Sequence, residues 1–395
     1  MRLPTIRPAG IASDVPSPSW LLREGDTVFA VLEDTDEVAS LRMVYRDVVG
    51  SDKSGGDSLK NREVTLEEIS RVKLPAKSEP THAAIAVDPQ LGRHLITADY
   101  ADGTVCVLPI GAGDVLGPVA QVLQGDPEHH GPLPAQEGRP HTHWILPLAD
   151  GRVLTTDLGA DRIYIHRWVG SRLVRTGFVS LAPGTGPRDI HVLPGPSGEF
   201  GEGGDWRIAV VDEWGCTVTI LEPVDPDGGG IGRTKESGGE DGKDKEAAEE
   251  FWVAQTVSLG GDKGQHPDQA ASLAFVPDAL CLADPAENQG NLVSPFSRGH
   301  VYVGLRGSER IVTLYWDGSK LSRLAKEDEN GWKGRGVSSG GKRPRHIKAV
   351  GNILIVANEI SDNLSLFRAA DDGEPVHLGD YPAGSPTVVL PLTGI

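Results

Sequence analysis

Charged and polar residues recur at two equivalent positions of a repeated sequence unit. One position follows the start of an apolar run and carries Ser19, Thr81, His141, Arg188, Arg345 and Thr387, with Ser272 as a looser equivalent. The other position ends the next apolar run and carries Glu33, Tyr100, Leu158, Glu213, Arg306 and Glu359. Core packing would fill such positions with apolar side chains. Several arginines, several glutamates and a histidine around one opening instead indicate a site for a small anion.

The repeated unit is complete between Gly138 and Val169, where three apolar runs are separated by two short polar turns. In the third run, RIYIHRWV, two kinds of side chain alternate with a period of two, as in a strand with different neighbours on its two faces. The stretch therefore predicts a three-stranded antiparallel meander. In such a meander the start of the first strand lies beside the end of the second, which brings the two polar positions together.

The second half of the unit recurs six times without a gap, as FAVLEDTDEV, ITADYADGTV, LTTDLGADRI, AVVDEWGCTV, YVGLRGSERI and IVANEISDNL. The opening run recurs seven times, from Pro18, Pro80, Pro140, Pro187, Pro344 and Pro386 and, without proline, from Ala270. Such repeats indicate a radial propeller, in which one strand of each blade lines a central channel. We predict an all-β fold, a seven-bladed β-propeller of four-stranded antiparallel blades. The closing blade is incomplete, because PTVVLPL has no following pair.

One propeller domain is expected to take up the whole chain, residues 1–395. Residues 226–250 are rich in glycine and charge and have no apolar period, so we predict a mobile surface insertion there. Two further loop insertions are expected near residues 284–298 and 326–342.

The chain is acidic, with a formal net charge of -18. Nucleic acids and anionic membrane surfaces need a basic footprint, so neither is expected as a partner. Cys106, Cys216 and Cys281 are odd in number and widely spaced, which favours a reducing environment. The start of the chain lacks the apolar core of a secretion signal, and no run reaches membrane-spanning length. We therefore expect a cytoplasmic protein, a monomer or a weak homo-oligomer.

His141 and His143 would share one face of a strand and could form a metal pair, but no third ligand with suitable spacing accompanies them. We expect no metal. A quinone cofactor is not expected either, because neither a cysteine pair nor a regular tryptophan motif supports it. Asp99, Asp157 and Asp212 share one repeat position and are expected to accept backbone N–H groups in turns.

From Pro16 onward the chain resembles the seven-bladed lactonase family, which includes propeller-type 6-phosphogluconolactonases and 3-carboxy-cis,cis-muconate lactonizing enzymes. The similar stretches are PTHAAIAVDPQLGRHLITADYADGTVCVLP, PHTHW, DLGADRI, PGTGPRDIHV, VDEWG and KRPRHIKAVGNILIVANEISDNLSLF. The order and spacing of these stretches make the resemblance specific. Three positions depart from it: Asp189 stands where many relatives have His, Gly304-Leu305 replaces Ser-Asn, and Ser272 stands where an acidic residue is common.

The resemblance implies hydrolysis of a sugar-acid or related lactone in carbohydrate metabolism, with a small anionic lactone or carboxylate as the substrate and His141, Arg188, Glu213 and Arg306 as the catalytic residues. His141 would be the general base, because the pKa of histidine is closest to neutrality. Glu213 would orient His141 or donate a proton. Arg188 and Arg306 would bind the phosphate or carboxylate of the substrate and stabilise the oxyanion. The expected substrate-binding residues are Arg345, His143, Tyr100 and Glu33.

Other interpretations stay open. The same groups could close a muconate-type acid into a lactone, as a cycloisomerase or an isomerase of secondary metabolism. A non-catalytic propeller that binds a protein or metabolite is a third possibility, although only 5% of the residues are aromatic. Arg188 and Arg345 could instead form ion pairs between blades, Glu33 and Glu359 could cap turns, and His143 could be a packing residue.

Overall fold

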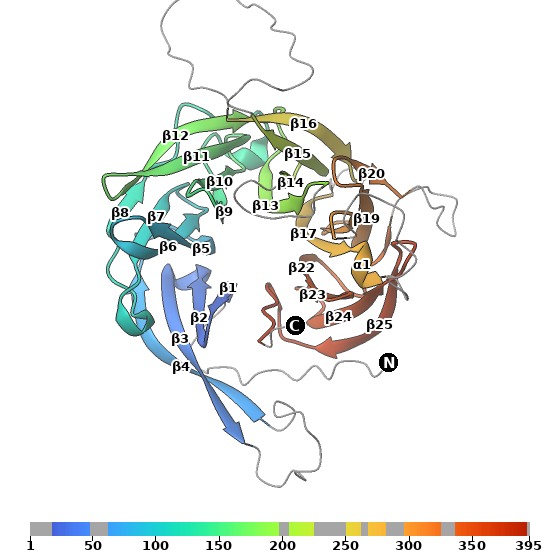
Figure 1. Cartoon of the computed structure of the whole chain (residues 1–395), viewed down its shortest axis with the longest axis horizontal. Coiled ribbons are helices and arrows are strands. Elements are labelled where there is room, and N and C mark those ends of the chain that lie inside the picture. Colours follow the sequence, from blue (N-terminus) through green and yellow to red (C-terminus); the bar gives the residue numbers. More distant parts are fainter. Residues whose placement is uncertain are drawn as a thin grey trace, which may run out of the picture.

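The computed structural model describes residues 18–47, 62–196, 205–224, 250–261, 268–281, 296–324 and 336–392. The described residues form six antiparallel sheets arranged around a central axis, an all-β propeller (Figure 1). We call the sheets blades 1 to 6 in chain order. The predicted insertion at 226–250 lies outside the described residues except for Glu250, as does most of 284–298.

Blades 1 to 3 each contain four strands. Blade 1 contains β1 (Pro18–Glu24), β2 (Thr27–Leu32), β3 (Glu37–Asp47) and β4 (Arg62–Lys73). Blade 2 contains β5 (Pro80–Asp88), β6 (Gly92–Asp99), β7 (Val105–Pro109) and β8 (Gln121–Leu123). Blade 3 contains β9 (Thr142–Pro147), β10 (Val153–Asp157), β11 (Arg162–Val169) and β12 (Arg172–Ser180).

Blades 4 to 6 follow the same order. Blade 4 contains β13 (Pro187–Pro194), β14 (Trp206–Asp212), β15 (Thr217–Pro223) and β16 (Phe251–Ser258). Blade 5 contains β17 (Ala270–Pro277), β18 (Gly299–Leu305), β19 (Arg310–Trp316) and β20 (Leu321–Arg323), with helix α1 (Asp278–Cys281) after β17. Blade 6 contains β22 (Pro344–Val350), β23 (Ile353–Asn358), β24 (Asn363–Ala369) and β25 (Pro375–Pro382).

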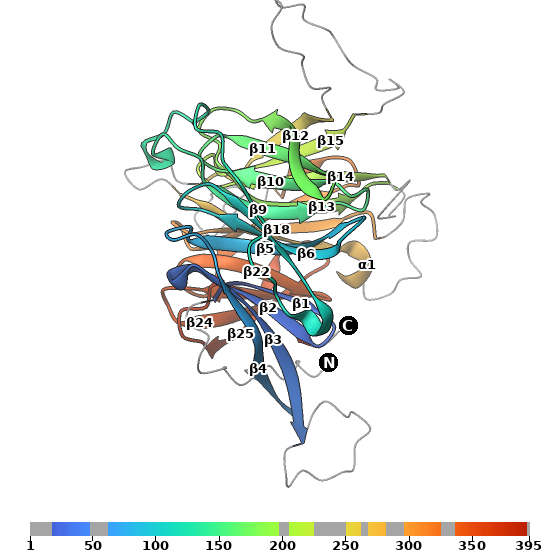
Figure 2. The same cartoon turned by 90° about the vertical axis from the view of Figure 1, so that its left-hand side faces the viewer.

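Two features extend the basic blade. The strands β3 and β4 form a long hairpin that projects beyond the other blades (Figures 1 and 2). A short strand, β21 (Val337–Ser338), pairs with β19 inside the segment 326–342 that the sequence analysis interpreted as a loop. Blade 5 can accept this addition because β20 is only three residues long and leaves one end of β19 unpaired.

The middle strands are buried because a neighbouring blade packs on each of their faces. Every residue of β2 and of β18 is buried. The hydrophobic clusters accordingly lie between blades rather than within them, as where Ala209 and Val211 of blade 4 pack with Val301 and Val303 of blade 5. Continuous apolar runs such as TVFAVL are what this two-sided burial requires.

Part of the expected turn chemistry differs from the prediction. Asp157 accepts the N–H groups of His141 and Ala160 at 2.8 and 3.0 Å, as predicted. Asp99 and Asp212 instead accept threonine hydroxyl groups, from Thr97 and Thr104 in one case and from Thr217 and Thr219 in the other. The prediction was wrong for these two because a threonine at the start of the next strand reaches the carboxylate first.

The C-terminal stretch Pro386–Leu392 lies between β22 and β1. Its Val389 N–H donates to Nδ1 of His346 at 3.0 Å, and its Thr387 hydroxyl donates to the carbonyl of Pro18 at 2.8 Å. Equivalent contacts join other neighbouring blades, as from Ile347 N–H to Ser272 and from Ser19 to the carbonyl of Pro80. The stretch thus makes the contacts of an inner strand, although the described residues contain only six sheets.

Three further findings bear on the expectations from composition. Cys106, Cys216 and Cys281 are all buried and free. Among the described residues no helix has the length and apolar character needed to cross a membrane. In the same part of the chain, no group of three or more histidine, cysteine, aspartate or glutamate side chains is arranged to hold a metal ion.

Candidate functional site

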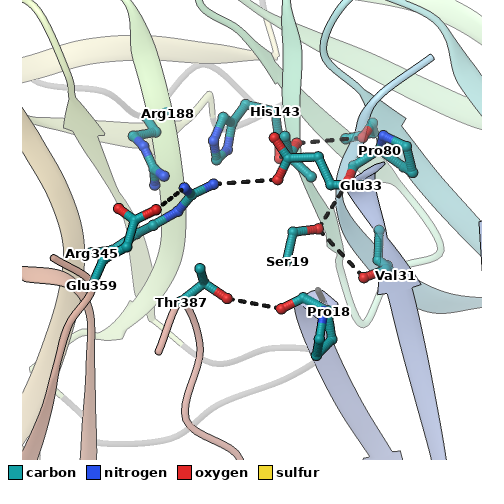
Figure 3. A network of polar contacts seen from close by, with 12 residues as sticks. Pro18, Ser19, Val31, Glu33, Pro80, His143, Arg188, Arg345, Glu359 and Thr387 are labelled. Atoms are coloured by element: carbon teal, nitrogen blue, oxygen red, sulfur yellow. Dashed lines mark hydrogen bonds and ion pairs between the residues drawn. The ribbon is translucent and has the colours of Figure 1, made fainter. Parts of the chain in front are cut away.

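A bulge near the start of the inner strands sets which side chains enter the channel. The pairing of β13 with β14 skips Arg188, and the pairing of β22 with β23 skips Arg345. In β9 the skipped residue is His143, because Thr142 pairs with Asp157 and Trp144 with Thr156. The bulge position that Arg188 occupies in blade 4 therefore belongs to His143 in blade 3, not to His141. In Figure 3 the side chains of His143, Arg188 and Arg345 converge on one space.

Blade 5 also departs from the expected alignment. The register of β17 shifts between Ala270 and Leu273, and the carbonyl of Ala271 within this shift accepts a hydrogen bond from Nη1 of Arg188 at 3.0 Å. Ser272, expected as the looser equivalent, lies one residue further along, and its hydroxyl accepts the N–H of Ile347 at 2.8 Å. Ser272 therefore connects blades 5 and 6.

Glu213 binds two arginines, one with each carboxylate oxygen. Its Oε2 lies 3.0 Å from Nε of Arg188, and its Oε1 lies 2.6 Å from Nη2 of Arg306. All three side chains are at least 90% buried. The structure thus brings three of the four predicted catalytic residues into direct contact across the boundary between blades 4 and 5.

The charges of this triad follow from its contacts. Burial alone would raise the pKa of Glu213, but Arg306 and Arg188 outweigh burial and lower it below its usual value. Burial and the neighbouring Arg306 lower the pKa of Arg188 to about 10, which leaves it charged at neutral pH. Glu213 is therefore a carboxylate, and a proton-donating role, one of the two expected for it, is disfavoured.

His141 precedes β9, and its ring has a defined orientation. Its Nδ1 lies 2.9 Å from the carbonyl oxygen of Tyr100, and its ring stacks on that of Tyr100 with centroids 4.5 Å apart. A carbonyl only accepts, so Nδ1 of His141 carries a hydrogen. The Nε2 atom is buried and has no hydrogen-bond partner among the described residues. Tyr100, rather than Glu213, orients His141 and leaves the Nε2 lone pair free.

Tyr100 contacts His141 and also feels the charges of Glu213 and the arginines. Its phenol pKa is raised to about 12 by burial and by the negative charge of Glu213, while Arg188 and Arg306 act in the opposite sense. The phenol therefore stays protonated and can donate a hydrogen bond. The edge of its ring also faces His143, with centroids 6.2 Å apart.

His143 is buried close to the arginines. Burial, followed by the charges of Arg188 and Arg345, lowers its pKa well below the usual value, so the ring is neutral. Its Nδ1 is buried without a hydrogen-bond partner in the described part of the chain. An unpaired buried nitrogen is costly, so this atom is suited to contact a polar ligand.

A second charged group lies where blade 6 approaches blade 1. Arg345 contacts Oε1 of Glu359 at 3.0 Å and Oε2 of Glu33 at 3.4 Å (Figure 3). Burial raises the pKa of Glu33, and Arg345 opposes that effect. Arg345 thus makes an ion pair between blades, and both glutamates bind an arginine rather than cap a turn.

Comparison with known proteins agrees with this architecture. Residues 4–228 match the family model described as lactonase, 7-bladed beta-propeller, which is more than half of the chain. The chain belongs to this family.

Similar proteins agree with the assignment. A 6-phosphogluconolactonase of Bacillus subtilis is 33% identical over 117 residues, which are 29% of this chain and 32% of that protein, so the matched region spans about a third of the relative. The structure of a Pseudomonas aeruginosa periplasmic gluconolactonase has a TM-score of 0.63 and 23% identity, covering 94% of this chain and 87% of that one. The structure of a protein from Lactobacillus plantarum has a TM-score of 0.65 and 19% identity, covering 95% of this chain and 88% of that one. These structures share the fold.

Sequence reasoning missed an aromatic cluster in the channel of this lactonase-family chain. The rings of Trp20 and His82 lie 4.3 Å apart, those of His82 and Trp144 stack at 3.8 Å, and that of Trp20 meets His346 at 5.4 Å. His191 adds a fifth ring, 5.5 Å from Trp144. The rings come from the inner strands of blades 1, 2, 3, 4 and 6. The sequence feature that could have revealed this cluster is an aromatic residue or histidine directly after the bulge, which occurs in four of these strands.

Proposed function

We propose that the chain hydrolyses a sugar-acid or related lactone. The names of the similar proteins, 6-phosphogluconolactonase and gluconolactonase, refer to this class of reaction. The observation that carries this proposal is the position of Tyr100, whose ring stacks on His141 with its unpaired, buried Nε2 and whose phenol feels the charges of Glu213, Arg188 and Arg306. Lactone hydrolysis needs a base for water and positive charge for the oxyanion. His141 supplies the base, and Arg188 with Arg306 supplies the positive charge.

The reaction follows from these positions. Nε2 of His141 takes a proton from water as the water oxygen bonds to the lactone carbonyl carbon. The negative charge that develops on the carbonyl oxygen is stabilised by Arg188 and Arg306. The ring carbon–oxygen bond then breaks, and the departing alkoxide takes the proton from the His141 imidazolium. The product is the open hydroxy acid, and His141 returns to its neutral form.

The remaining predicted residues contact the substrate in this proposal. The Tyr100 hydroxyl and the unpaired, buried Nδ1 of His143 bind ring hydroxyl groups, because both side chains are neutral. Arg345 and Glu33 border the same space on the side of blade 1 (Figure 3). Their charges bear on which lactone is accepted.

The blade count is part of the proposal. Pro386–Leu392 makes the same inter-blade contacts as the other inner strands, which supports its interpretation as the inner strand of a seventh blade. The lactone-forming direction, the non-catalytic binding role, the oligomeric state and the cytoplasmic location stay predictions; one similar structure is of a periplasmic protein.

The test is acid release from aldonolactones by the purified full chain, measured in a pH-stat. We expect His141→Gln to lower kcat by roughly 10²–10⁴-fold, the usual contribution of a general base. The matched control is His377→Gln on the outermost strand β25, which should keep full activity. Equal activity in the His141 variant and the wild type would refute the role of His141. A folded wild-type protein without activity on any lactone would refute the proposed function.

A further inference from the structure

The arginines that border the site are already paired with carboxylates of the same chain. Arg188 and Arg306 share Glu213, whereas Arg345 lies between Glu33 and Glu359. These contacts place three guanidinium groups against three carboxylates. A site built to neutralise a doubly charged ligand would instead leave guanidinium groups free for it.

The charges are unevenly divided. The group of Arg188, Arg306 and Glu213 has one positive charge in excess, and the group of Arg345, Glu33 and Glu359 has one negative charge in excess. Arg343 contacts Oε2 of Glu359 at 3.0 Å, but 43% of its side chain is exposed, so solvent weakens its compensation.

Further charges near the rim do not favour an anion either. Asp34 and Glu79 act on Glu33 as like charges, and Glu137 acts in the same way on Tyr100. On the side of Tyr100, in the segment between β8 and β9, Arg139 is paired with Glu137. The side of the site formed by blades 6 and 1 is thus acidic overall.

A phosphate group carries about -1.5 to -2 charges at pH 7. Placed near Arg345, it would have to compete with Glu33 and Glu359 for the same guanidinium, and the displaced carboxylates would remain beside it. Like charges at such a contact oppose binding strongly. By contrast, the single excess positive charge at Arg188 and Arg306 matches the one negative charge of a tetrahedral oxyanion.

We propose that the site selects a lactone without a phosphate group, and that Glu33 and Glu359 enforce this selection by occupying Arg345. The inference rests on the proposed function and narrows its substrate class. The arginine pair at Glu213 serves the reaction centre, and Arg345 with its two glutamates excludes a second anionic group. Product release fits the same division, because the product has only one carboxylate.

The test compares kcat/KM for glucono-1,5-lactone and its 6-phosphate at low ionic strength. We expect the full chain to favour the unphosphorylated lactone by about tenfold or more, the scale of one unfavourable charge contact. Glu33→Gln should reduce that preference several-fold by raising kcat/KM for the phosphorylated substrate. Glu24→Gln, on the exposed end of β1, is the matched control and should leave the ratio unchanged.

Either of two results would overturn the inference: a preference for the phosphorylated lactone, or a ratio that Glu33→Gln leaves unchanged. Absence of turnover with both lactones would count against the proposed function, and binding then decides the charge question separately. Gluconate and 6-phosphogluconate would be titrated into the same protein by calorimetry. Tighter binding of gluconate supports the inference, whereas tighter binding of the phosphorylated acid, or no binding of either, refutes it.

Discussion

Two groups of charged residues at the same end of the channel use the same residue types in opposite proportions. Between blades 4 and 5, one carboxylate holds two arginines in a buried contact. Between blades 6 and 1, two carboxylates hold the part-buried Arg345 in a more exposed contact, and only the solvent-exposed Arg343 adds a second arginine, at Glu359. The repeat places both groups at equivalent strand ends, so the fold alone does not set their chemistry. The ratio of arginine to glutamate decides whether a strand end attracts or repels an anion.

Among substitutions in the two charged groups, Glu213→Gln is expected to cause the largest loss in the free energy of unfolding. This change leaves two buried guanidinium groups without their carboxylate, and breaking a buried ion pair costs about 3–5 kcal/mol. We expect a loss of that size in the free energy of unfolding by urea, together with loss of lactone hydrolysis. The control is Glu359→Gln, which leaves Arg345 its contact with Glu33 and should cost less. Equal losses in the two variants would contradict the comparison.

Ionisation of Glu33 and ionisation of Glu213 are expected to change the stability of the folded protein in opposite directions. The pKa of Glu213 is lowered in the folded state, so its contribution to stability is present above its unfolded value of 4.5 and is lost as the pH falls through the folded pKa. The pKa of Glu33 is raised, so ionising it disfavours folding once the pH rises above 4.5, and that penalty is complete above the folded pKa.

Urea midpoints at pH 4 and pH 7 separate these cases. Glu213→Gln should be clearly less stable than the wild type at pH 7, and the gap should narrow toward pH 4. Glu33→Gln should be as stable as the wild type or more stable at pH 7, with the difference vanishing at pH 4. The assignment of opposite roles would be wrong if both variants lost stability at pH 7 to the same extent.

The smallest expected effect concerns closure of the ring beside the acidic group. Thr387→Val removes the hydroxyl that donates to the carbonyl of Pro18 and should cost about 1 kcal/mol. Ser19→Ala removes the corresponding contact with Pro80 between two complete blades and is the matched comparison. Similar losses in urea unfolding would show that the C-terminal stretch serves as an inner strand. No loss at Thr387 would show that the ring closes without it.

Much of this arrangement could be predicted from the sequence because it depends on periodicity. The repeat identified the strand pairs of all six blades and placed Arg188, Glu213 and Arg306 at one end of the channel. The position of His143 was not predicted, because the repeat was aligned on the prolines, whereas the residue before the bulge in β9 is Thr142, two residues after Pro140, so the equivalence moves from His141 to His143. Such a shift depends on backbone conformation, which the alternation of side chains does not record.

The pairing of charges was also beyond the sequence. The pattern offered Glu33, Glu213 and Glu359 as equivalent partners for the arginines, and only the packed side chains show which pairs form. The aromatic cluster was missed for a related reason. Trp20 and His346 are separated by most of the chain, and nothing local indicates that their rings meet at the axis.

The aromatic cluster provides a second set of contacts that stabilises the circular arrangement of the blades. Where blade 6 approaches blade 1, the described residues contain no complete sheet between them, only the stretch Pro386–Leu392. The contact of Trp20 with His346 joins the inner strands on the two sides of this gap, and the rings of His82 and Trp144 continue it into blades 2 and 3. Ring contacts between inner strands thus hold the propeller together near its axis, in addition to the hydrogen bonds that the C-terminal stretch makes. Separation of blades 6 and 1 at the gap would therefore also disturb the ring contacts of blades 2 and 3.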